Sequence, residues 1–463
     1  MGKVVLIQSQ LLLDLEVGLK EYNKVHKPKL KLDVAVFYLS LFNSVPSYIR
    51  EEVVEEINER EVSLSSKRLK WYNDNYKSYF DYFLNNDLII HKSNYGADIN
   101  RCNGYSLSSN YFNDDVIPYE IMDKVFSKKF DKKLGLEVLG KYKFYQTYAE
   151  RNRGHLTRSF NERLIIDKNE AFSIAKALKQ SNYYSYTNAK QLINEFANNQ
   201  WRYSIKTETD NRLHTNLTRL NKKLKRCLKY DNEYLSAVDI GCSQPYFFCV
   251  FLQGLLDRNK ELFDCLGITD LVGETEIKEL INLIDRAEVE SFVSLITECD
   301  FYEDFGKKIN VKYDEFGTIY RMSKIKNKRG KKKRGLFKEC FKTKRDYAKN
   351  AIMRVFFSQN NKSEDFKCFQ KSYYNISCVM GFIKQYCLPF HSLLSNIEAK
   401  CLLDVVAKDF CVKYPEIPLW SIHDSLVTTE KNIDLLYKEV KVRMNDLTGI
   451  EVTLKKEYWG NIK

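Results

Sequence analysis

Two apolar segments of this chain each deliver a single aspartate. Asp239 ends the run LSAVD, before a tight Gly-Cys-Ser-Gln-Pro turn and an aromatic helix, and Asp424 follows His423 at the centre of the segment 419–429. Because each segment is a short apolar run, we expect both to be strands. Side by side, such strands would offer a carboxylate pair to two divalent metal ions, which stabilise the attacking and leaving oxygens of a phosphoryl displacement. Taken singly, each aspartate also fits a turn or a helix cap.

A basic segment lies between these two aspartates. Residues 343–359 contain no Gly or Pro and predict one helix, on which Arg345 and Lys349 share a face and Phe356 and Phe357 follow two turns later. Two cations and an aromatic ring suit a nucleoside triphosphate, since the cations hold phosphates and the ring stacks on base or sugar. A solvated basic helix with a buried phenylalanine end is the alternative.

In this order, the three segments resemble motifs A, B and C of the fold shared by family A DNA polymerases and the single-subunit RNA polymerases of phages and mitochondria. The matching residues are Asp239 in motif A, Arg345, Lys349 and Phe357 in motif B, and His423 and Asp424 in motif C. Phe357 and Ser358 stand where the family usually has Tyr and Gly, and Ser425 matches the RNA polymerases rather than the Glu of the DNA polymerases.

A fourth segment strengthens the resemblance. Residues 207–217, with Arg212 and Asn216, resemble the element that precedes motif A and touches primer–template, although Asn211 replaces its glycine. Glu398, in the helix before motif C, is a candidate for the primer-terminal side, or else a solvent-facing residue on a helix that packs the core.

The resemblance implies a two-metal nucleotidyltransferase with nucleoside triphosphates and a nucleic-acid primer–template as partners. Asp239, Asp424 and the backbone carbonyl of Ile240 would hold two Mg²⁺ ions, with Mn²⁺ as a substitute. Arg345 and Lys349 would bind the triphosphate, and Lys349 would also donate a proton to the departing pyrophosphate. His423 would complete the catalytic set.

The choice of sugar is expected to depend on Gln244, five residues after Asp239. DNA polymerases of this family usually place Glu there, against the ribose 2′-hydroxyl, and RNA polymerases place Gly. Gln244 is bulky, Phe357 lacks a hydroxyl, and the short distance from Lys349 to Asp424 leaves little room for a promoter-reading insertion. These features favour a DNA polymerase, while the Cys-Ser of motif A and the His-Asp-Ser of motif C are RNA-like and keep a single-subunit RNA polymerase as the alternative.

The expected fold is α+β: a right-hand polymerase with palm, fingers and thumb behind a mostly helical N-terminal region. We place that region at residues 1–120 and palm and fingers at 236–463. Between them, residues 121–235 are expected to form a thumb-like helical region with the primer–template element near 207–220. Residues 1–33 predict a helical lead-in, and residues 34–112 predict three helices and a hairpin, the order of a winged helix or of a generic helical cap. A non-enzymatic, nucleic-acid-binding replication initiator is therefore a further alternative.

Composition limits the class of protein. The 463 residues carry 74 Lys and Arg against 61 Asp and Glu, a net charge of +13 that suits a polyanionic partner. The run at 324–334 holds eight basic residues and is expected to grip phosphates unless it is a solvated loop. The 12 cysteines form no CxxC pair, and we find no signal peptide, lipidation signal, membrane span or exonuclease motif, so we expect a cytoplasmic protein without proofreading. Its size and its Lys- and Asn-rich composition suit a phage or mobile-element protein.

Overall fold

The computed structural model describes residues 3–44, 61–94, 102–111, 114–126, 137–139, 144–146, 148–181, 183–207, 209–324, 336–359 and 361–462. Helices and strands are mixed along the chain, as expected for an α+β protein. The run at 325–334 lies outside the described residues, so its predicted contact with nucleic acid remains a prediction.

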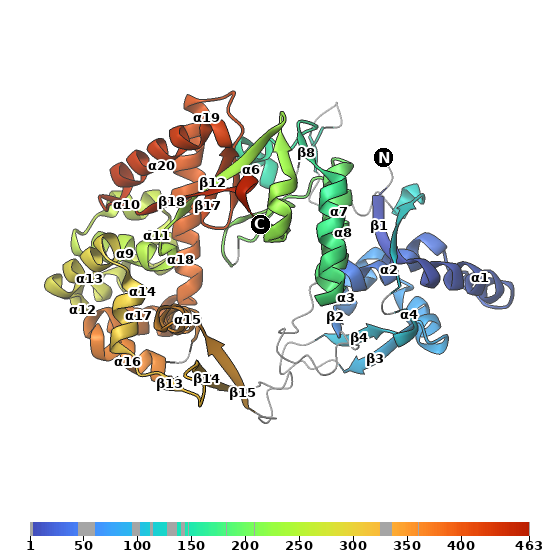
Figure 1. The fold of residues 1–463 in the computed structure, drawn as a ribbon, viewed down its shortest axis with the longest axis horizontal. Helices are drawn as coiled ribbons and strands as arrows, with labels where there is room; N and C mark the ends of the chain where they lie inside the picture. The colour runs from blue at the N-terminus through green and yellow to red at the C-terminus, as the bar shows by residue number, and fades with distance from the viewer. Residues whose placement is uncertain are drawn as a thin grey trace.

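The N-terminal unit forms the blue part of the ribbon in Figure 1. Its buried apolar side chains form a hydrophobic core of their own. Its elements are β1 (Lys3–Gln8), α1 (Ser9–Val25), α2 (Leu32–Ser44), β2 (Val62–Leu64), α3 (Ser66–Tyr72), α4 (Tyr76–Asn85), β3 (Ile89–Ser93), β4 (Asn103–Leu107), η2 (Ser109–Tyr111) and β5 (Val116–Ile121). The predicted hairpin is present as β3 and β4, and β2 adds a third antiparallel strand beside β4.

Two predictions for this unit are wrong in detail. The lead-in begins with a strand rather than a helix, because β1 pairs with β5 more than a hundred residues later. The third helix predicted within 34–112, an aromatic helix over residues 65–84, is two helices, α3 and α4, separated at Asn73. The side chain of Asn73 accepts a hydrogen bond of 2.9 Å from the backbone of Asn75, a local turn that competes with helix continuation. The second predicted helix, at 48–57, lies outside the described residues.

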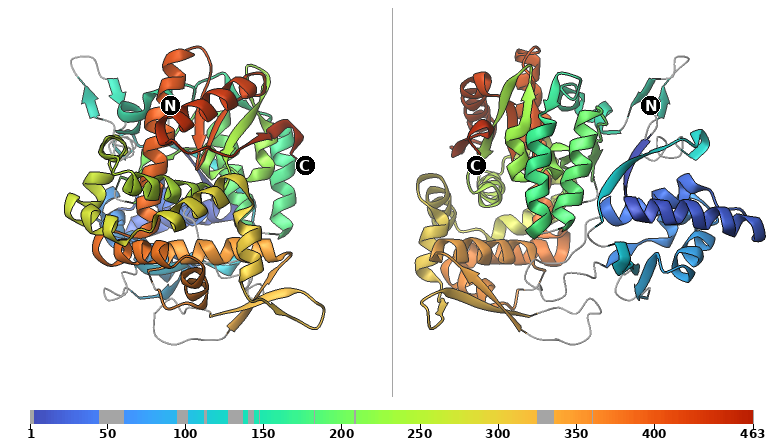
Figure 2. Two further views of the ribbon diagram at one scale, coloured as in Figure 1. Left: turned by 90° about the vertical axis from the view of Figure 1, so that its left-hand side faces the viewer. Right: turned by 45° about the vertical axis from the view of Figure 1, so that its right-hand side comes forward.

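A helical hairpin links this unit to the rest of the chain. Helices α7 and α8 lie side by side, and α2 and β1 contact α8 (Figure 2). The elements of this region are β6 (Glu137–Leu139), β7 (Phe144–Gln146), α6 (Tyr148–Thr157), β8 (Leu164–Ile166), α7 (Lys168–Ser181), α8 (Tyr183–Ala197), β9 (Ser204–Ile205), β10 (Leu213–His214), η3 (Leu217–Arg219) and η4 (Lys222–Cys227).

An antiparallel sheet carries both candidate aspartate segments. Its path runs β16 (Trp420–Ile422), β17 (Ser425–Thr429), β12 (Glu233–Ile240), β11 (Leu228–Tyr230) and β8, and β18 (Leu454–Tyr458) pairs with the second edge of β12. The boundary expected between residues 235 and 236 therefore runs through β12. Trp420 and Trp459 are fully buried in the core against this sheet.

Helices pack against the other side of the sheet and extend away from it. They are α9 (Ser243–Leu256), α10 (Lys260–Cys265), α11 (Ile268–Val272), α12 (Glu274–Leu283), α13 (Arg286–Glu298), α14 (Phe301–Lys308), α15 (Lys344–Phe357), α16 (Glu364–Ser372), α17 (Tyr374–Phe382), η5 (Ile383–Cys387), α18 (Phe390–Ala399), η6 (Lys400–Val406), α19 (Ala407–Lys413), η7 (Glu430–Asn432) and α20 (Ile433–Thr448). The short helix η8 (Trp459–Asn461) instead carries Trp459 and packs against β12 and η4. A small antiparallel sheet precedes α15: β13 (Lys312–Tyr313), β14 (Ile319–Lys324) and β15 (Leu336–Phe341).

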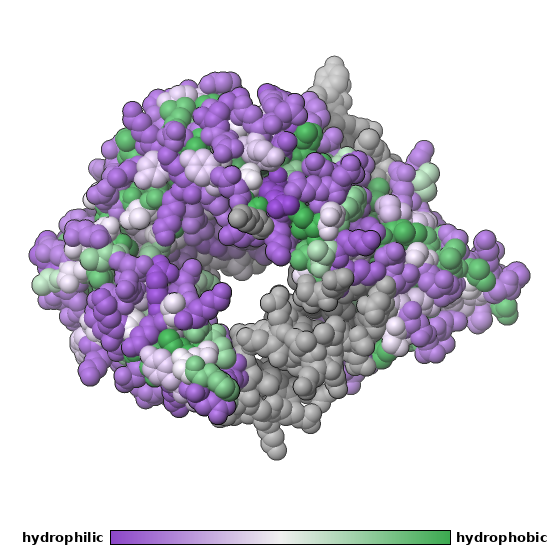
Figure 3. Space-filling view, in the orientation of Figure 1, coloured by the Kyte–Doolittle hydropathy of each residue, from purple (hydrophilic) through white to green (hydrophobic). Residues whose placement is uncertain are grey.

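Two of these helices position the site. Helix α9 is apolar all round and almost wholly buried, as expected for a helix inside a large core. The predicted helix at 343–359 is confirmed as α15, and its Thr343 cap accepts a hydrogen bond of 3.1 Å from the Asp346 backbone. Figure 3 shows mainly hydrophilic residues on the described part of this face. Within the described ranges, no helix is both long and apolar enough to cross a bilayer.

Candidate active site

The first candidate carboxylate lies at the end of a buried strand. Strand β12 delivers Asp239, and Gly241 and Cys242 then turn the chain into α9. A Cβ on Gly241 would lie 3.1 Å from the backbone oxygen of Thr453, so this close approach favours glycine. Cys242 takes a left-handed conformation with φ 51°, which completes the sharp turn.

The second candidate carboxylate lies in a hairpin turn. The prediction of one strand with Asp424 at its centre is wrong, because β16 ends at Ile422 and β17 begins at Ser425. His423 takes the left-handed conformation that reverses the chain, with φ 52°. A two-residue turn explains why an apolar run can contain two adjacent polar residues.

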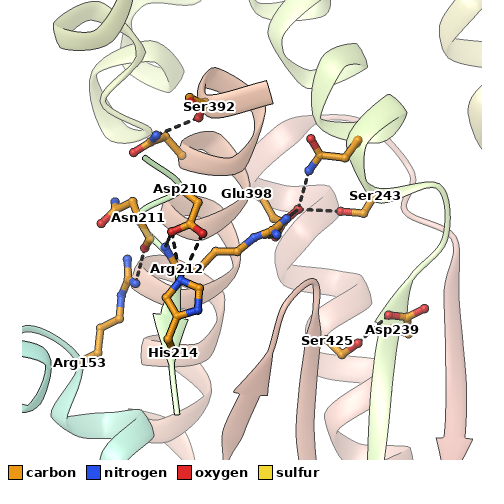
Figure 4. Close-up of polar contacts among 12 residues, drawn as sticks. Arg153, Asp210, Asn211, Arg212, His214, Asp239, Ser243, Ser392, Glu398 and Ser425 are labelled. Atoms are coloured by element: carbon orange, nitrogen blue, oxygen red, sulfur yellow. Dashed lines mark hydrogen bonds and ion pairs between the residues drawn. The ribbon is translucent and has the colours of Figure 1, made fainter. Parts of the chain in front are cut away.

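Antiparallel pairing of β12 with β17 brings the two segments together. The register sets Asp239 opposite Ser425, and the Ser425 hydroxyl donates a 2.5 Å hydrogen bond to Asp239 Oδ1 (Figure 4). The backbone NH of Ile240 donates to the Asp424 carbonyl at 3.4 Å. This pairing brings together Asp239, at the end of β12, and Asp424, 185 positions later in the sequence. The prediction that both aspartates lie on adjacent strands is wrong for Asp424, which lies in the turn before β17.

The electrostatics of this pair suit a divalent cation. Burial raises the pKa of Asp239, and the negative charge of Asp424 adds to the rise although the Ser425 hydrogen bond opposes it. Burial and the charge of Glu398 raise the pKa of Asp424. Desolvated neighbouring carboxylates are relieved by a bound cation, and Mg²⁺ commonly takes one or two carboxylates with water and substrate phosphates as its remaining ligands. The donor set therefore fits Mg²⁺, although the described residues hold no cluster of three or more His, Cys, Asp or Glu side chains.

The adjacent histidine is biased toward its neutral form. Desolvation by the surrounding atoms, and then the positive charge of Arg212, lower the pKa of His423, while Asp424 acts in the opposite direction. A neutral imidazole can accept or donate a hydrogen bond beside the carboxylates without adding charge.

The cations of α15 act electrostatically on the turn that follows Asp239. Burial and then the charge of Asp300 raise the pKa of the Cys242 thiol. The charges of Arg345 and Lys349 both oppose this rise. Arg345 donates to Asp300 at 2.6 Å, and its guanidinium lies 5.6 Å from the centre of the Tyr302 ring.

The pKa of Tyr302 responds to groups from several segments. Burial raises it, the charges of the Cys242 thiol and the Asp424 carboxylate add to the rise, and the charge of Arg345 lowers it. The side chain of Lys349 is exposed. Arg345 and Lys349 would both offer positive charge to a phosphate chain.

The aromatic pair at the end of α15 divides into one core residue and one surface residue. Phe356 is fully buried, in edge contact with Phe248 and Phe390. Phe357 is 45% exposed and stacks on His391, with ring centroids 5.1 Å apart. The Phe357 ring is therefore accessible from outside the protein, whereas the Phe356 ring is not.

Glu398 is the centre of a buried polar network (Figure 4). The alternative of a solvent-facing Glu398 is wrong, since the residue is 1% exposed. Arg212 donates two hydrogen bonds of 2.7 Å to its carboxylate, and Ser243 Oγ and Gln244 Nε2 donate at 2.8 and 3.0 Å. Burial opposes the charged guanidinium, but Glu398 outweighs that effect and raises the pKa of Arg212. Candidate residues from three segments are thereby joined.

Asn216 is not brought to this site. Its side chain is fully buried, donates to Glu195 at 2.8 Å and to the Gln200 carbonyl at 3.2 Å, and accepts from the Arg202 backbone at 2.8 Å. A direct contact of Asn216 with primer–template is therefore not supported by its position, and its role is to hold the chain between α8 and η3.

Sequence reasoning missed several residues of the site. The Ser425 hydroxyl donates a hydrogen bond to Asp239, and the Ser243 hydroxyl donates one to Glu398. Asp300 and Tyr302 both contact Arg345. Asp300 carried a local signal, since it precedes a helix and caps it by accepting from the Glu303 backbone. Its pairing with Arg345 had no signal, because the two residues belong to different helices.

Comparison with known proteins identifies no family. No family model matches the chain, and no curated protein matches it. A similar solved structure is the POL domain of Pol1 from M. smegmatis in complex with DNA primer–template and dNTP, at 9% identity over 62% of this chain and 56% of that chain, with a TM-score of 0.25. Since that score is too low to indicate a shared fold, the argument for function rests on the geometry of the site.

Proposed function

We propose that this chain is a template-directed nucleotidyltransferase, a DNA polymerase that uses Mg²⁺ and acts on a primer–template with deoxynucleoside triphosphates. The observation that carries the proposal is the juxtaposition of Asp239 and Asp424 across the β12–β17 pairing. The charges of Arg345 and Lys349 both lower the pKa of the Cys242 thiol, in the turn after Asp239, which supports a role for these cations near the carboxylates.

Each residue has a role that its position supports. Asp239, Asp424 and the carbonyl of Ile240 would hold the metal ions, which when bound stabilise the attacking and leaving oxygens. Arg345 and Lys349 would neutralise the triphosphate, and Lys349 would protonate the departing pyrophosphate.

The Glu398 network would orient the residues nearest the primer end. Arg212 is 21% exposed at its side chain and is fixed by two hydrogen bonds to Glu398, so its direction is set before nucleic acid binds. Because Ser243 and Gln244 share the same carboxylate, the start of α9 is held in register with Arg212.

An RNA polymerase is the second candidate, favoured by one observation. Gln244 Oε1 is buried and has no hydrogen-bond partner within the described structure, whereas its Nε2 is bonded to Glu398. A ribose 2′-hydroxyl could donate to this oxygen, and a deoxyribose could not. The bulk of Gln244 favours dNTPs and its orphaned oxygen favours rNTPs, so a direct comparison of substrates decides between them.

Primer extension with the full chain tests the proposal. Wild type, Asp424→Asn and Asp434→Asn are incubated with dNTPs or rNTPs on DNA and RNA templates in Mg²⁺. Asp434 is a matched control because its carboxylate is exposed and pairs with Lys456 on the surface. We expect extension by wild type and by the control, and a loss of about three orders of magnitude in Asp424→Asn, since one carboxylate of a metal pair contributes several kcal/mol.

Two outcomes would contradict the proposal. Full extension by Asp424→Asn would remove the carboxylate pair from the chemistry. No extension by wild type on any template, with retained nucleic-acid binding, would favour the non-enzymatic replication initiator.

A further inference from the structure

A second polar site lies where the N-terminal unit meets α8. A cavity of about 320 Å³ is lined on one side by residues of α2, β2 and α3, and on the other by Gln191 of α8 and by two arginines that follow α8. Three arginines line this cavity: Arg68, Arg202 and Arg219. None of its lining residues belongs to the candidate active site.

Among the residues that the structure describes, the arginines of this cavity outnumber the carboxylates that pair with them. Glu195, 2% exposed, pairs with Arg202 at 2.7 Å and with Arg219 at 3.5 Å. Arg68 has no carboxylate partner among the residues that the structure describes, so three guanidiniums face one carboxylate, an excess of two positive charges. Burial lowers the pKa of Arg219. The charge of Glu195 raises this pKa, and the charge of Arg202 lowers it further.

The remaining wall is apolar and partly aromatic. Phe37, Leu64, Leu69 and Tyr72 line the cavity beside the arginines. Apolar and aromatic walls with a few convergent polar groups are typical of small-molecule sites, and this volume is at the lower end of their range. The cavity therefore has room for about one nucleotide unit.

We propose that this cavity binds the phosphate monoester of a nucleotide, either as a free nucleoside monophosphate or as the phosphorylated end of a nucleic-acid strand. A phosphate monoester carries about two negative charges at neutral pH, which matches the excess of two positive charges. Arginine recognises phosphate oxygens in a bidentate manner, and the aromatic wall would contact base or sugar.

Isothermal titration of the full chain tests this assignment. The probes are dAMP and deoxyadenosine, in EDTA so that binding at the carboxylate pair is minimised. Arg68→Gln is the principal variant because Arg68 is exposed and lies outside the Glu195 ion pairs, and Lys67→Gln is its control because Lys67 is an exposed neighbour on α3 that does not line the cavity. We expect dAMP to bind, deoxyadenosine not to bind, and Arg68→Gln alone to weaken dAMP by about ten- to a hundredfold.

Oligonucleotides of one sequence, with a 5′-phosphate, a 3′-phosphate or hydroxyls at both ends, distinguish the two sources. If a terminal phosphate increases the affinity and Arg68→Gln abolishes this increase, the cavity binds strand ends. If dAMP binds but a terminal phosphate gives no increase, the cavity binds free nucleotides. The proposal is overturned if Arg68→Gln changes neither dAMP affinity nor the effect of a terminal phosphate. Because no probe requires catalysis, failure here is separate from failure of the polymerase proposal.

Discussion

Replacing Glu398 by Gln is expected to weaken the C-terminal core more than any exposed charge neutralisation would. The substitution keeps the shape of the side chain and removes its charge. Arg212 then loses its counter-ion, and the new amide nitrogen cannot accept hydrogen bonds from Ser243, Gln244 or Arg212, all of which donate to Glu398.

The magnitude follows from burial. Removing one partner of a buried ion pair costs about 3–5 kcal/mol, because the other charge is left without compensation. Glu398 is 1% exposed, but the Arg212 side chain is 21% exposed and water can partly solvate it. We therefore expect a loss somewhat below that range, about 2–4 kcal/mol.

Urea unfolding followed by tryptophan fluorescence measures this loss. Trp420 and Trp459 are fully buried against the β12 sheet and report its unfolding. With an m-value of about 3 kcal/mol/M, the midpoint of Glu398→Gln should fall by about 1 M. Asp409→Asn is the control. Asp409 lies on α19, which continues the helical run of α18 and η6, and it pairs with Arg443. Both side chains of this pair are at least 42% exposed. Such a pair contributes about 0–1 kcal/mol, a shift below about 0.3 M.

A Glu398→Gln midpoint equal to that of Asp409→Asn would refute the reasoning. It would mean that, in the folded protein, water stabilises the Arg212 guanidinium as well as Glu398 does. The double variant Arg212→Met, Glu398→Gln adds a further check, because removing both charges should restore part of the stability lost in the single variant.

Three further predictions concern the site and its supporting helices. Gln244→Gly should lower the ratio of kcat/KM for dNTP over rNTP by about 5- to 150-fold by removing bulk beside the sugar, and a rise in that ratio would support the RNA polymerase reading. Asp300→Asn should lower KM for the nucleoside triphosphate by up to about fivefold, because it releases Arg345 from a half-exposed ion pair. An unchanged or higher KM in steady-state assays would contradict this prediction. Burial lowers the pKa of Lys384 to about 8, so between pH 8 and 10.5 the unfolded chain binds more protons than the folded one and wild type should gain stability. Denaturation of wild type and Lys384→Met at pH 7, 8, 9 and 10 should show this gain in wild type alone, and parallel curves would refute it.

Local patterns were sufficient for the elements that carry the candidate residues. The apolar run before Asp239 predicts β12, and the uninterrupted segment at 343–359 predicts α15 with its cations on one face. These predictions hold because strand and helix periodicity depend on residues a few positions apart. Where a local signal was weak, as at the turn at His423 and Asp424, the predicted strand was wrong.

Contacts between distant segments were decided by the tertiary structure. The pairing of β12 with β17 sets Asp239 opposite Ser425, and packing of α18 against α9 buries Glu398 beside Gln244. The ion pair of Arg212 with Glu398 joins residues 186 positions apart, and no periodicity specifies such a partner. The arginine cavity is a further case, because its guanidiniums come from segments that meet only when the N-terminal unit packs on α8. By itself, the sequence determined which side chains and local elements could do chemistry, whereas burial and long-range packing determined which of them meet and with what charge.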